Sequence, residues 1–175
     1  MPKTNYIVIP EVSSERRKYL PCAILSPEVF VSNKLWVMTR GSFYEFGIIS
    51  SQIHAAWTRT VTGRLKSDYQ YSGAVVYNNF VWPNPNEEQR VEIEKHAQAV
   101  IDTRNNYPES SLADMYDPDN DFLYPDLMAV HKALDHAVEQ AYGVSCNGDE
   151  EKIVAHLFKL SRTTRTTTQE EQSGR

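Results

Sequence analysis

Short apolar runs alternate with turn residues over the first half of the chain. The runs are rich in β-branched and aromatic residues and are bounded by proline, glycine or asparagine, a composition typical of strands. We therefore expect strands at residues 6–9, 22–25, 35–38 and 43–49. This part of the chain is predicted to be a small β-rich unit.

One segment of this half repeats its apolar residues with a helical period. The apolar positions are spaced i, i+3, i+4 and i+8 and therefore share one face of a helix: Ile53, Ala56, Trp57 and Val61. Ser50 or Ser51 is suited to cap the start of this helix. Gly63 follows as the expected left-handed C-cap.

The second half of the chain has a helical period, starting after the proline-rich junction at 82–86. Asn84, Pro85 and Glu87 resemble a capping box at the start of a first helix. Its apolar stripe consists of Ile93, Ala97, Val100 and Ile101. Two further helices are predicted by the same period, at about 126–142, closed by Gly143, and 149–161.

These patterns predict an α+β protein in which a small β-rich unit with one helix precedes a three-helix unit. The tail is rich in Thr, Gln and Glu and poor in apolar residues, so we expect it to be disordered. The predicted boundaries are 1–83 for the β-rich unit, 84–161 for the helical domain and 162–175 for the tail.

The segment from Arg64 to Tyr71 places hydrogen-bonding side chains at every second position. If the segment is extended, one side carries Arg64, Lys66, Asp68 and Gln70, and the other carries a leucine, a serine and two tyrosines. A strand that reads base edges in DNA has use for such a row, because lysine suits guanine, aspartate suits cytosine and glutamine suits adenine. A solvent-facing strand of an antiparallel sheet is the commoner use of this alternation.

Composition narrows the class of protein. The 175 residues are 41% hydrophobic, which suits one domain or two small ones. No apolar run approaches the roughly 20 residues that span a bilayer, and the N-terminus lacks the apolar core of a signal peptide. Cys22 and Cys146 are lone thiols, far apart in sequence, which favours a reducing compartment. We therefore expect a cytoplasmic protein with no membrane partner.

The net charge of −5 conceals a division between the two halves. Residues 1–72 contain nine Lys/Arg and five Asp/Glu, or +4, whereas residues 73–175 contain nine and eighteen, or −9. An anion-binding part joined to an acidic part has this asymmetry. A charge of +4 is modest for an independent DNA-binding domain, so we do not expect the first part to hold DNA alone.

Six residues are candidates for contacts to DNA phosphates, which give affinity without sequence information: Ser14, Arg16, Arg17, Lys18, Arg59 and Arg64. The first four lie in one polar run that also suits a solvated basic turn. Arg59 and Arg64 flank the end of the predicted helix, where cations also stabilise the helix dipole.

Four residues are candidates for reading bases. Lys66 and Asp68 are two apart and can form an exposed ion pair or contact the guanine and cytosine of one base pair. Lys34, after a turn-prone Ser-Asn pair, is by itself a surface lysine, and Gln70 continues the alternating row.

The sequence contains no recognisable catalytic set. It lacks a glycine-rich phosphate loop, a nucleophile elbow and a cluster with metal-ligand spacing. The acidic run at 114–121 alternates like a calcium loop but lacks the glycine and closing glutamate of one, which favours a solvated linker. The segment 78–83 is similar to an Asn-Pro-Pro-Tyr catalytic loop, but its two consecutive prolines are absent.

Several motifs together resemble one family, the C-terminal part of the adenine-specific DNA methyltransferases of single-chain type IIG restriction–modification systems. The motifs occur in the family's order and lie at residues 9–17, 32–33, 46–57, 63–69, 77–83, 110–118 and 141–143. In that family a nuclease and a methyltransferase core that binds S-adenosylmethionine precede a target recognition domain and a short helical region. The resemblance implies that this chain matches only the end of recognition and the helices.

The resemblance also implies roles and partners. The chain is expected to hold no cofactor itself, with S-adenosylmethionine bound in the parent enzyme, and to have double-stranded DNA and the methyltransferase core of the same polypeptide as partners. Lys66 and Asp68 are expected to specify one G·C pair, and Lys34 with Gln70 a second. An alternative is a protein-interaction or scaffold domain without direct DNA readout.

Overall fold

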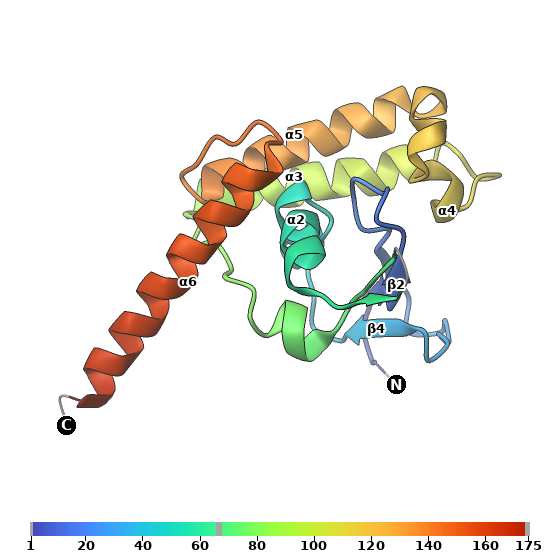
Figure 1. Cartoon of the computed structure of the whole chain (residues 1–175). Coiled ribbons are helices and arrows are strands. Elements are labelled where there is room, and N and C mark those ends of the chain that lie inside the picture. The colour runs from blue at the N-terminus through green and yellow to red at the C-terminus, as the bar shows by residue number, and fades with distance from the viewer. Residues whose placement is uncertain (1, 66–67, 174–175) are drawn as a thin grey trace.

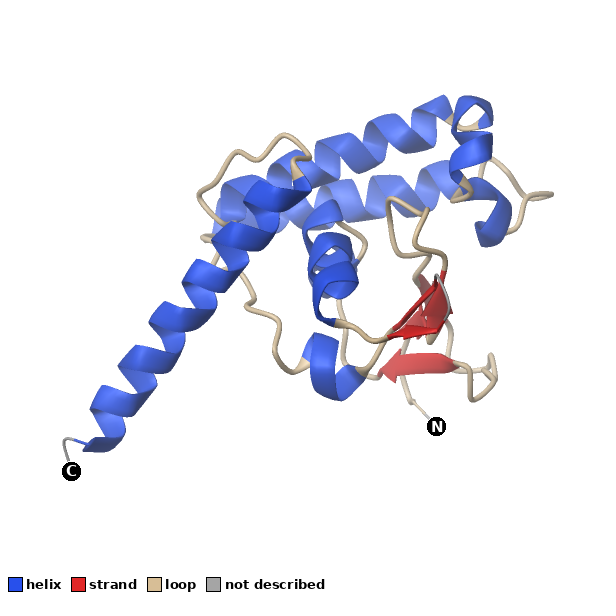
Figure 2. Ribbon diagram, in the orientation of Figure 1, coloured by secondary structure: helices blue, strands red, loops and turns tan. Residues whose placement is uncertain are grey.

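The computed structural model describes the main chain of residues 2–65 and 68–173 and, within these, the side chains of all but residues 64–65 and 164–173. Two long helices, α3 (Glu87–Arg104) and α5 (Pro125–Ala141), lie side by side along one side of the molecule (Figure 1). The strands lie on the other side, and the fold is α+β as predicted (Figure 2).

The first sheet is built around strand β1 (Tyr6–Pro10). It pairs antiparallel with β3 (Ala23–Leu25) on one edge and with β4 (Leu35–Met38) on the other. The register places Ile7 opposite both Ile24 and Met38. These three strands were predicted from their apolar composition, and the prediction is confirmed.

A second small sheet has the order β2–β6–β5, with β2 at Val12–Ser13, β6 at Asp68–Gln70 and β5 at Arg64–Leu65. Strands β5 and β6 pair antiparallel, with Leu65 opposite Asp68. The chain therefore reverses between them, and the prediction of one extended strand from Arg64 to Tyr71 is wrong. Two paired strands satisfy each other's backbone N–H and C=O groups, which a single isolated strand cannot do.

The predicted strand at 43–49 is instead helix α1 (Phe43–Ile49). Ser42 caps it, and the carboxylate of Glu45 accepts a hydrogen bond of 2.6 Å from the N–H of Ser42, which completes a capping box. Gly47 permits close approach to α3, because a β-carbon there would lie 2.8 Å from Ile93 Cγ2. The cap and this tertiary contact outweigh the β-propensity of the apolar residues.

Helix α2 (Gln52–Val61) was predicted, and Ser51 caps it through the N–H of His54. The predicted left-handed C-cap at Gly63 is wrong, because the helix ends at Thr62 in an extended conformation. Among the glycines in the described part of the chain, only Gly143 and Gly148 have positive φ. Gly143 closes α5 as predicted.

The π-helical turn η1 (Gly73–Tyr77) follows β6. Helix α3 then starts later than predicted, since Asn86, rather than Asn84, is its N-cap and Gln89 completes the capping box. Pro85 thus lies outside the helix, and Glu87 is its first residue. The short helix α4 (Leu112–Met115) and the 3-10 helix η2 (Pro118–Leu123) connect α3 to α5.

The last helix, α6 (Glu150–Ser173), was predicted to end near Ser161. Its buried residues Ile153 and Leu157 pack towards α2. The predicted disordered tail, 162–175, falls mostly on residues whose side chains lie outside the described part, so it stays a prediction. No helix in the described residues is long and apolar enough to cross a bilayer.

The hydrophobic core is continuous between the strand-containing part and the long helices. Arg104, at the end of α3, is buried at this junction. Its guanidinium donates to the carbonyl oxygen of Cys22 at 2.8 Å and to the hydroxyl of Tyr116 at 2.8 Å. The Tyr116 hydroxyl is in turn 2.6 Å from Nε2 of His131 on α5, so one buried polar network joins both parts.

A second polar contact holds α5 against α2. The Asp135 carboxylate accepts from the N–H of Gln52 at 2.7 Å and from the hydroxyl of Tyr19 at 2.7 Å. Burial, together with the nearby Glu139, outweighs these bonds and raises the pKa of Asp135 from 3.8 to about 6. Asp135 is therefore a charge enclosed at the N-terminus of α2.

The raised pKa of Asp135 predicts a measurable dependence of stability on pH. Asp135 is neutral below about pH 4, and its ionisation lowers the free energy of unfolding as pH rises through its folded pKa of about 6. We expect the stability of wild type relative to Asp135→Asn to fall by about 2 kcal/mol between pH 4 and pH 7. Urea unfolding at each pH measures this difference.

Comparing the two proteins isolates Asp135 from the buried histidines. Burial lowers the pKa of His54 to about 3 and that of His131 well below 6.5, but both residues are present in each protein. Asp102→Asn, at an exposed position of α3, controls for the loss of one negative charge. If the difference in the free energy of unfolding between wild type and Asp135→Asn does not change with pH, the prediction is contradicted.

Candidate nucleic-acid interface

Two of the predicted base-reading residues meet in the structure, although they are far apart in sequence. Nζ of Lys34 lies 3.6 Å from one carboxylate oxygen of Glu11, and the amide of Gln70 donates to the other at 3.2 Å. Lys34 is 76% exposed in its side chain, so these bonds leave donors free to bind another molecule. The two residues and Glu11 form a polar cluster on the surface where the two sheets join.

Glu11 was not among the predicted site residues. It lies between β1 and β2, where its N–H donates to the carbonyl of Lys34 at 2.9 Å and its carbonyl accepts from the N–H of Tyr71 at 2.7 Å. A single glutamate after a proline gives no sequence signal for such a role. The pairing of β1 with β4 and of β2 with β6 brings it to the cluster.

Strand β6 separates a polar side from a packed side. Asp68 is partly exposed and Gln70 is exposed, while Tyr69 between them is fully buried. Tyr71 is buried as well, so both tyrosines of this segment pack into the core. Lys66, the remaining predicted base-reading residue, lies outside the described residues, two positions before Asp68.

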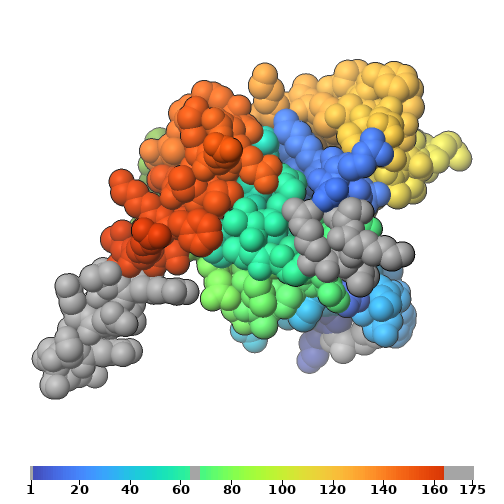
Figure 3. All heavy atoms as spheres, in the orientation of Figure 1, coloured from blue at the N-terminus to red at the C-terminus, as the bar shows by residue number. Residues whose placement is uncertain are grey.

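The basic segment 13–18 follows β2 and lies against η2, as the space-filling view shows (Figure 3). Arg16 forms an exposed ion pair with Asp119, and the hydroxyl of Ser14 accepts from the N–H of Arg16 at 3.3 Å. The predicted solvated linker around Asp119 therefore has structural contacts, since Asp117 also caps η2.

Arg59 holds the main chain of this basic segment in place. Its side chain is only 12% exposed, and its Nε and Nη2 each donate at 2.9 Å to Glu150 at the start of α6. Nη1 donates to the carbonyl of Arg17 at 3.0 Å. Arg59 thus holds the main chain of the basic segment and α6 together, which leaves its guanidinium little exposed surface.

The other candidate phosphate contacts differ in exposure. Lys18 is exposed, with Nζ 5.2 Å from the centre of the Tyr19 ring, and Arg17 is half-buried. The side chain of Arg64 lies outside the described residues. The exposed cations of this surface are therefore Arg16, Lys18 and Lys34 among the candidates that the structure describes.

The described residues contain no group of three or more side chains arranged to bind a metal ion. Cys22 and Cys146 are both buried and free, and burial raises the pKa of the Cys22 thiol to about 11. The arrangement offers surface charge and hydrogen-bond donors, which suit binding to a polyanion.

Comparison with known proteins matches both halves of the chain to domains of one family. A family model described as MmeI, target recognition domain, matches residues 1–84, and one described as MmeI, C-terminal domain, matches residues 85–168. DNA methyltransferase A of Bacillus subtilis (strain 168) is 35% identical over 158 residues, which are 90% of this chain and 18% of that protein.

A solved structure shows the same fold. The type IIL restriction–modification enzyme MmeI in complex with DNA matches with a TM-score of 0.89 and 39% identity, over 94% of this chain and 22% of that one. The chain therefore spans about a fifth of the length of these relatives.

The enclosed contacts of Arg59 predict a specific sensitivity. Arg59→Lys should lower the free energy of unfolding by about 1–2 kcal/mol, because lysine keeps the charge but cannot make the paired bonds to Glu150 and the bond to Arg17. Arg16→Lys is the matched control in an exposed ion pair and should leave the denaturation midpoint unchanged. Equal losses of unfolding free energy in Arg59→Lys and Arg16→Lys would contradict the prediction.

Proposed function

This chain belongs to the MmeI family, with a target recognition domain followed by a C-terminal domain, and we propose that it is the DNA sequence recognition portion of a larger adenine-specific DNA methyltransferase of a restriction–modification system. The observation that carries this proposal is the exposed polar surface of β6, Lys34 and Glu11 beside the cations of segment 13–18. Base readout needs exposed donors and acceptors, and DNA affinity needs neighbouring cations.

In this proposal, Lys66 and Asp68 specify one G·C pair. Lysine donates to guanine and aspartate accepts from the amino group of cytosine. Two residues of chain span at most about 7 Å, so the two side chains stay within reach of the same base pair or its neighbour. Asp68 is partly exposed at the start of β6, which is consistent with a role at the surface.

Lys34 and Gln70 read a second, nearby pair. Their common contact with Glu11 supports this part of the proposal, because the carboxylate restrains both side chains before DNA arrives. Restraint in advance reduces the conformational entropy that binding removes. Lys34 directly precedes β4, which pairs with β1, and Gln70 lies on β6, which pairs with β2. Glu11, between β1 and β2, therefore connects the two sheets that carry the readers.

Segment 13–18 contributes phosphate contacts through Ser14, Arg16, Arg17 and Lys18, with Arg64 beyond helix α2. Arg59 supports these contacts by holding the main chain at Arg17. Methyl transfer, base flipping and S-adenosylmethionine binding belong to the rest of the parent polypeptide, whose methyltransferase core is the partner of this chain.

Exchanging the charges of the first reading pair tests the proposal. Lys66→Glu/Asp68→Arg should invert the preferred base pair at one position of the recognition site, from G·C to C·G or the reverse, and leave the other positions unchanged. Contacts of this kind discriminate by about 1–3 kcal/mol, so the preference should change by roughly 10- to 100-fold. Selection of bound sequences from a random duplex pool at low salt measures it.

Glu92→Lys/Lys95→Glu exchanges an exposed ion pair on α3 and is the matched control for reversed charge order. That variant should keep the wild-type preference. Unchanged preference at every position in Lys66→Glu/Asp68→Arg would defeat the assignment of these two residues.

The phosphate contacts predict a loss of affinity that is independent of sequence. Lys18→Ala should weaken binding equally to the preferred duplex and to a scrambled duplex, and reduce the slope of log K against log salt by about 1. Lys95→Ala removes an exposed lysine from α3 and should change neither quantity. A loss confined to the preferred duplex would argue against a phosphate contact.

A further inference from the structure

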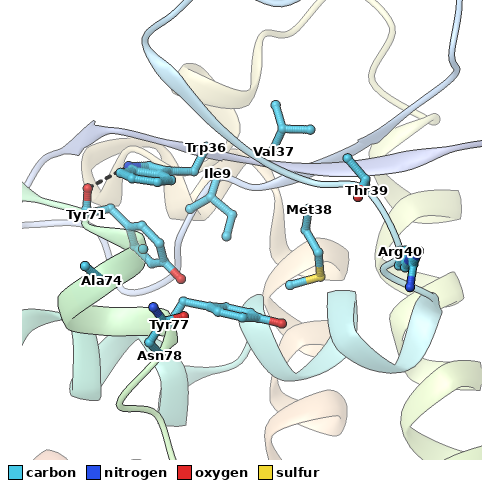
Figure 4. A pocket seen from close by; sticks show the side chains of 11 residues that line it. Ile9, Trp36, Val37, Met38, Thr39, Arg40, Tyr71, Ala74, Tyr77 and Asn78 are labelled. Atoms are coloured by element: carbon cyan, nitrogen blue, oxygen red, sulfur yellow. Dashed lines mark hydrogen bonds between the residues drawn. The ribbon is translucent and has the colours of Figure 1, made fainter. Parts of the chain in front are cut away.

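An apolar pocket of about 500 Å3 lies between β4 and η1. Its walls include Ile9, Trp36, Met38, Tyr71 and Tyr77 (Figure 4). Most of the lining side chains are apolar or aromatic, and none of them belongs to the candidate DNA-reading cluster. We call this region the β4 pocket.

The β4 pocket is preformed by its own contacts. The indole Nε1 of Trp36 donates to the carbonyl of Tyr71 at 2.8 Å, which fixes the ring against η1. A β-carbon at Gly73 would lie 2.9 Å from the Trp36 ring, so glycine permits this close approach. A fixed wall of this kind can receive a partner without rearrangement.

Strand β4 also has an open edge beside the pocket. It pairs with β1 on one side, and no other strand in the described part of the chain pairs with it. Trp36 is 43% and Val37 40% exposed. Soluble proteins usually protect such edges with charged residues or proline, and Leu35–Met38 contains neither. An unprotected apolar edge indicates a surface that is covered in the working protein.

The occupant must be apolar and able to supply a strand. DNA is a poor fit, because Arg40 is the one cation among the lining residues that the structure describes. The N-terminal end of this chain lies beside β4 (Figure 1). About four-fifths of each relative's length has no counterpart here, so polypeptide joined to this end would begin next to the pocket.

We propose that β4 and its pocket receive an apolar strand from the part of the parent polypeptide outside this chain, which pairs with the open edge of β4. The inference rests on the proposed function in one respect, that the chain is a portion of a larger methyltransferase. Main-chain pairing supplies affinity, and the pocket selects an apolar side chain of the added strand. The added strand would thereby fix the reading surface relative to the methyltransferase core, since Lys34 directly precedes β4.

Hydrogen exchange tests the proposal. The probe is DNA methyltransferase A of Bacillus subtilis in which the matching region is replaced by this chain, compared with this chain alone. The amides of Leu35–Met38 should exchange at least tenfold more slowly in the chimera. The segment at Phe122–Leu123, which is also apolar and exposed, should exchange equally in both. Equal exchange of β4 in the two proteins overturns the proposal.

Two other occupants have their own outcomes. If β4 in the isolated chain becomes protected as protein concentration rises, and sedimentation shows a dimer, the occupant is a second copy and the proposal is wrong. If a 30-base-pair duplex alone protects β4, DNA covers this edge and the proposal is likewise wrong.

Val37→Lys adds a charge at the open edge and should return β4 exchange in the chimera to the rate of the isolated chain. Val91→Lys makes the same substitution at a 50%-exposed position on α3 and should not. If Val37→Lys does not fold, the comparison of wild-type proteins still decides. If β4 is protected in the chimera but the chimera does not bind DNA, the proposed function is wrong and the docking inference still holds.

Discussion

The proposed reading surface depends on how Glu11 joins the two sheets. The main chain of Glu11 is bonded on one side to Lys34 and on the other to Tyr71, and its carboxylate contacts Lys34 and Gln70. One residue thus holds the backbone of Lys34 and the side chains of both candidate readers, Lys34 and Gln70. Strands β4 and β6 belong to separate sheets of three strands each, and the contacts of Glu11 help to set the spacing between them.

Behind this surface, buried polar groups fix the helices relative to the strands. Arg104 on α3 bonds to the carbonyl preceding β3 and to Tyr116, while Asp135 on α5 bonds to the first turn of α2. Such groups stabilise one arrangement because any displacement would leave a buried donor or acceptor without a partner. The orientation of the proposed reading surface is therefore tied to the helical part of the chain.

Local patterns in the sequence predicted the strands β1, β3 and β4 from their apolar, β-branched composition and the helices α2 and α5 from their helical period. They failed at α1, where the cap at Ser42 and the close contact of Gly47 with α3 outweigh β-propensity. They also failed at the run from Arg64 to Tyr71, which the antiparallel pairing of β5 with β6 divides. Lys34 and Gln70 were proposed as readers from the family resemblance and, for Gln70, the alternating row. Their common contact with Glu11 depends on strand register, which no local pattern encodes.

The continuous core has a consequence for recombination between related chains. A crossover near residue 84 would separate Gly47 from Ile93 and Arg104 from Cys22, and a foreign partner would have to match both contacts. Recombination between relatives is therefore expected to transfer the two family domains as a single cassette. Inherited breakpoints should cluster outside the pair of domains, and rarely at the seam between them.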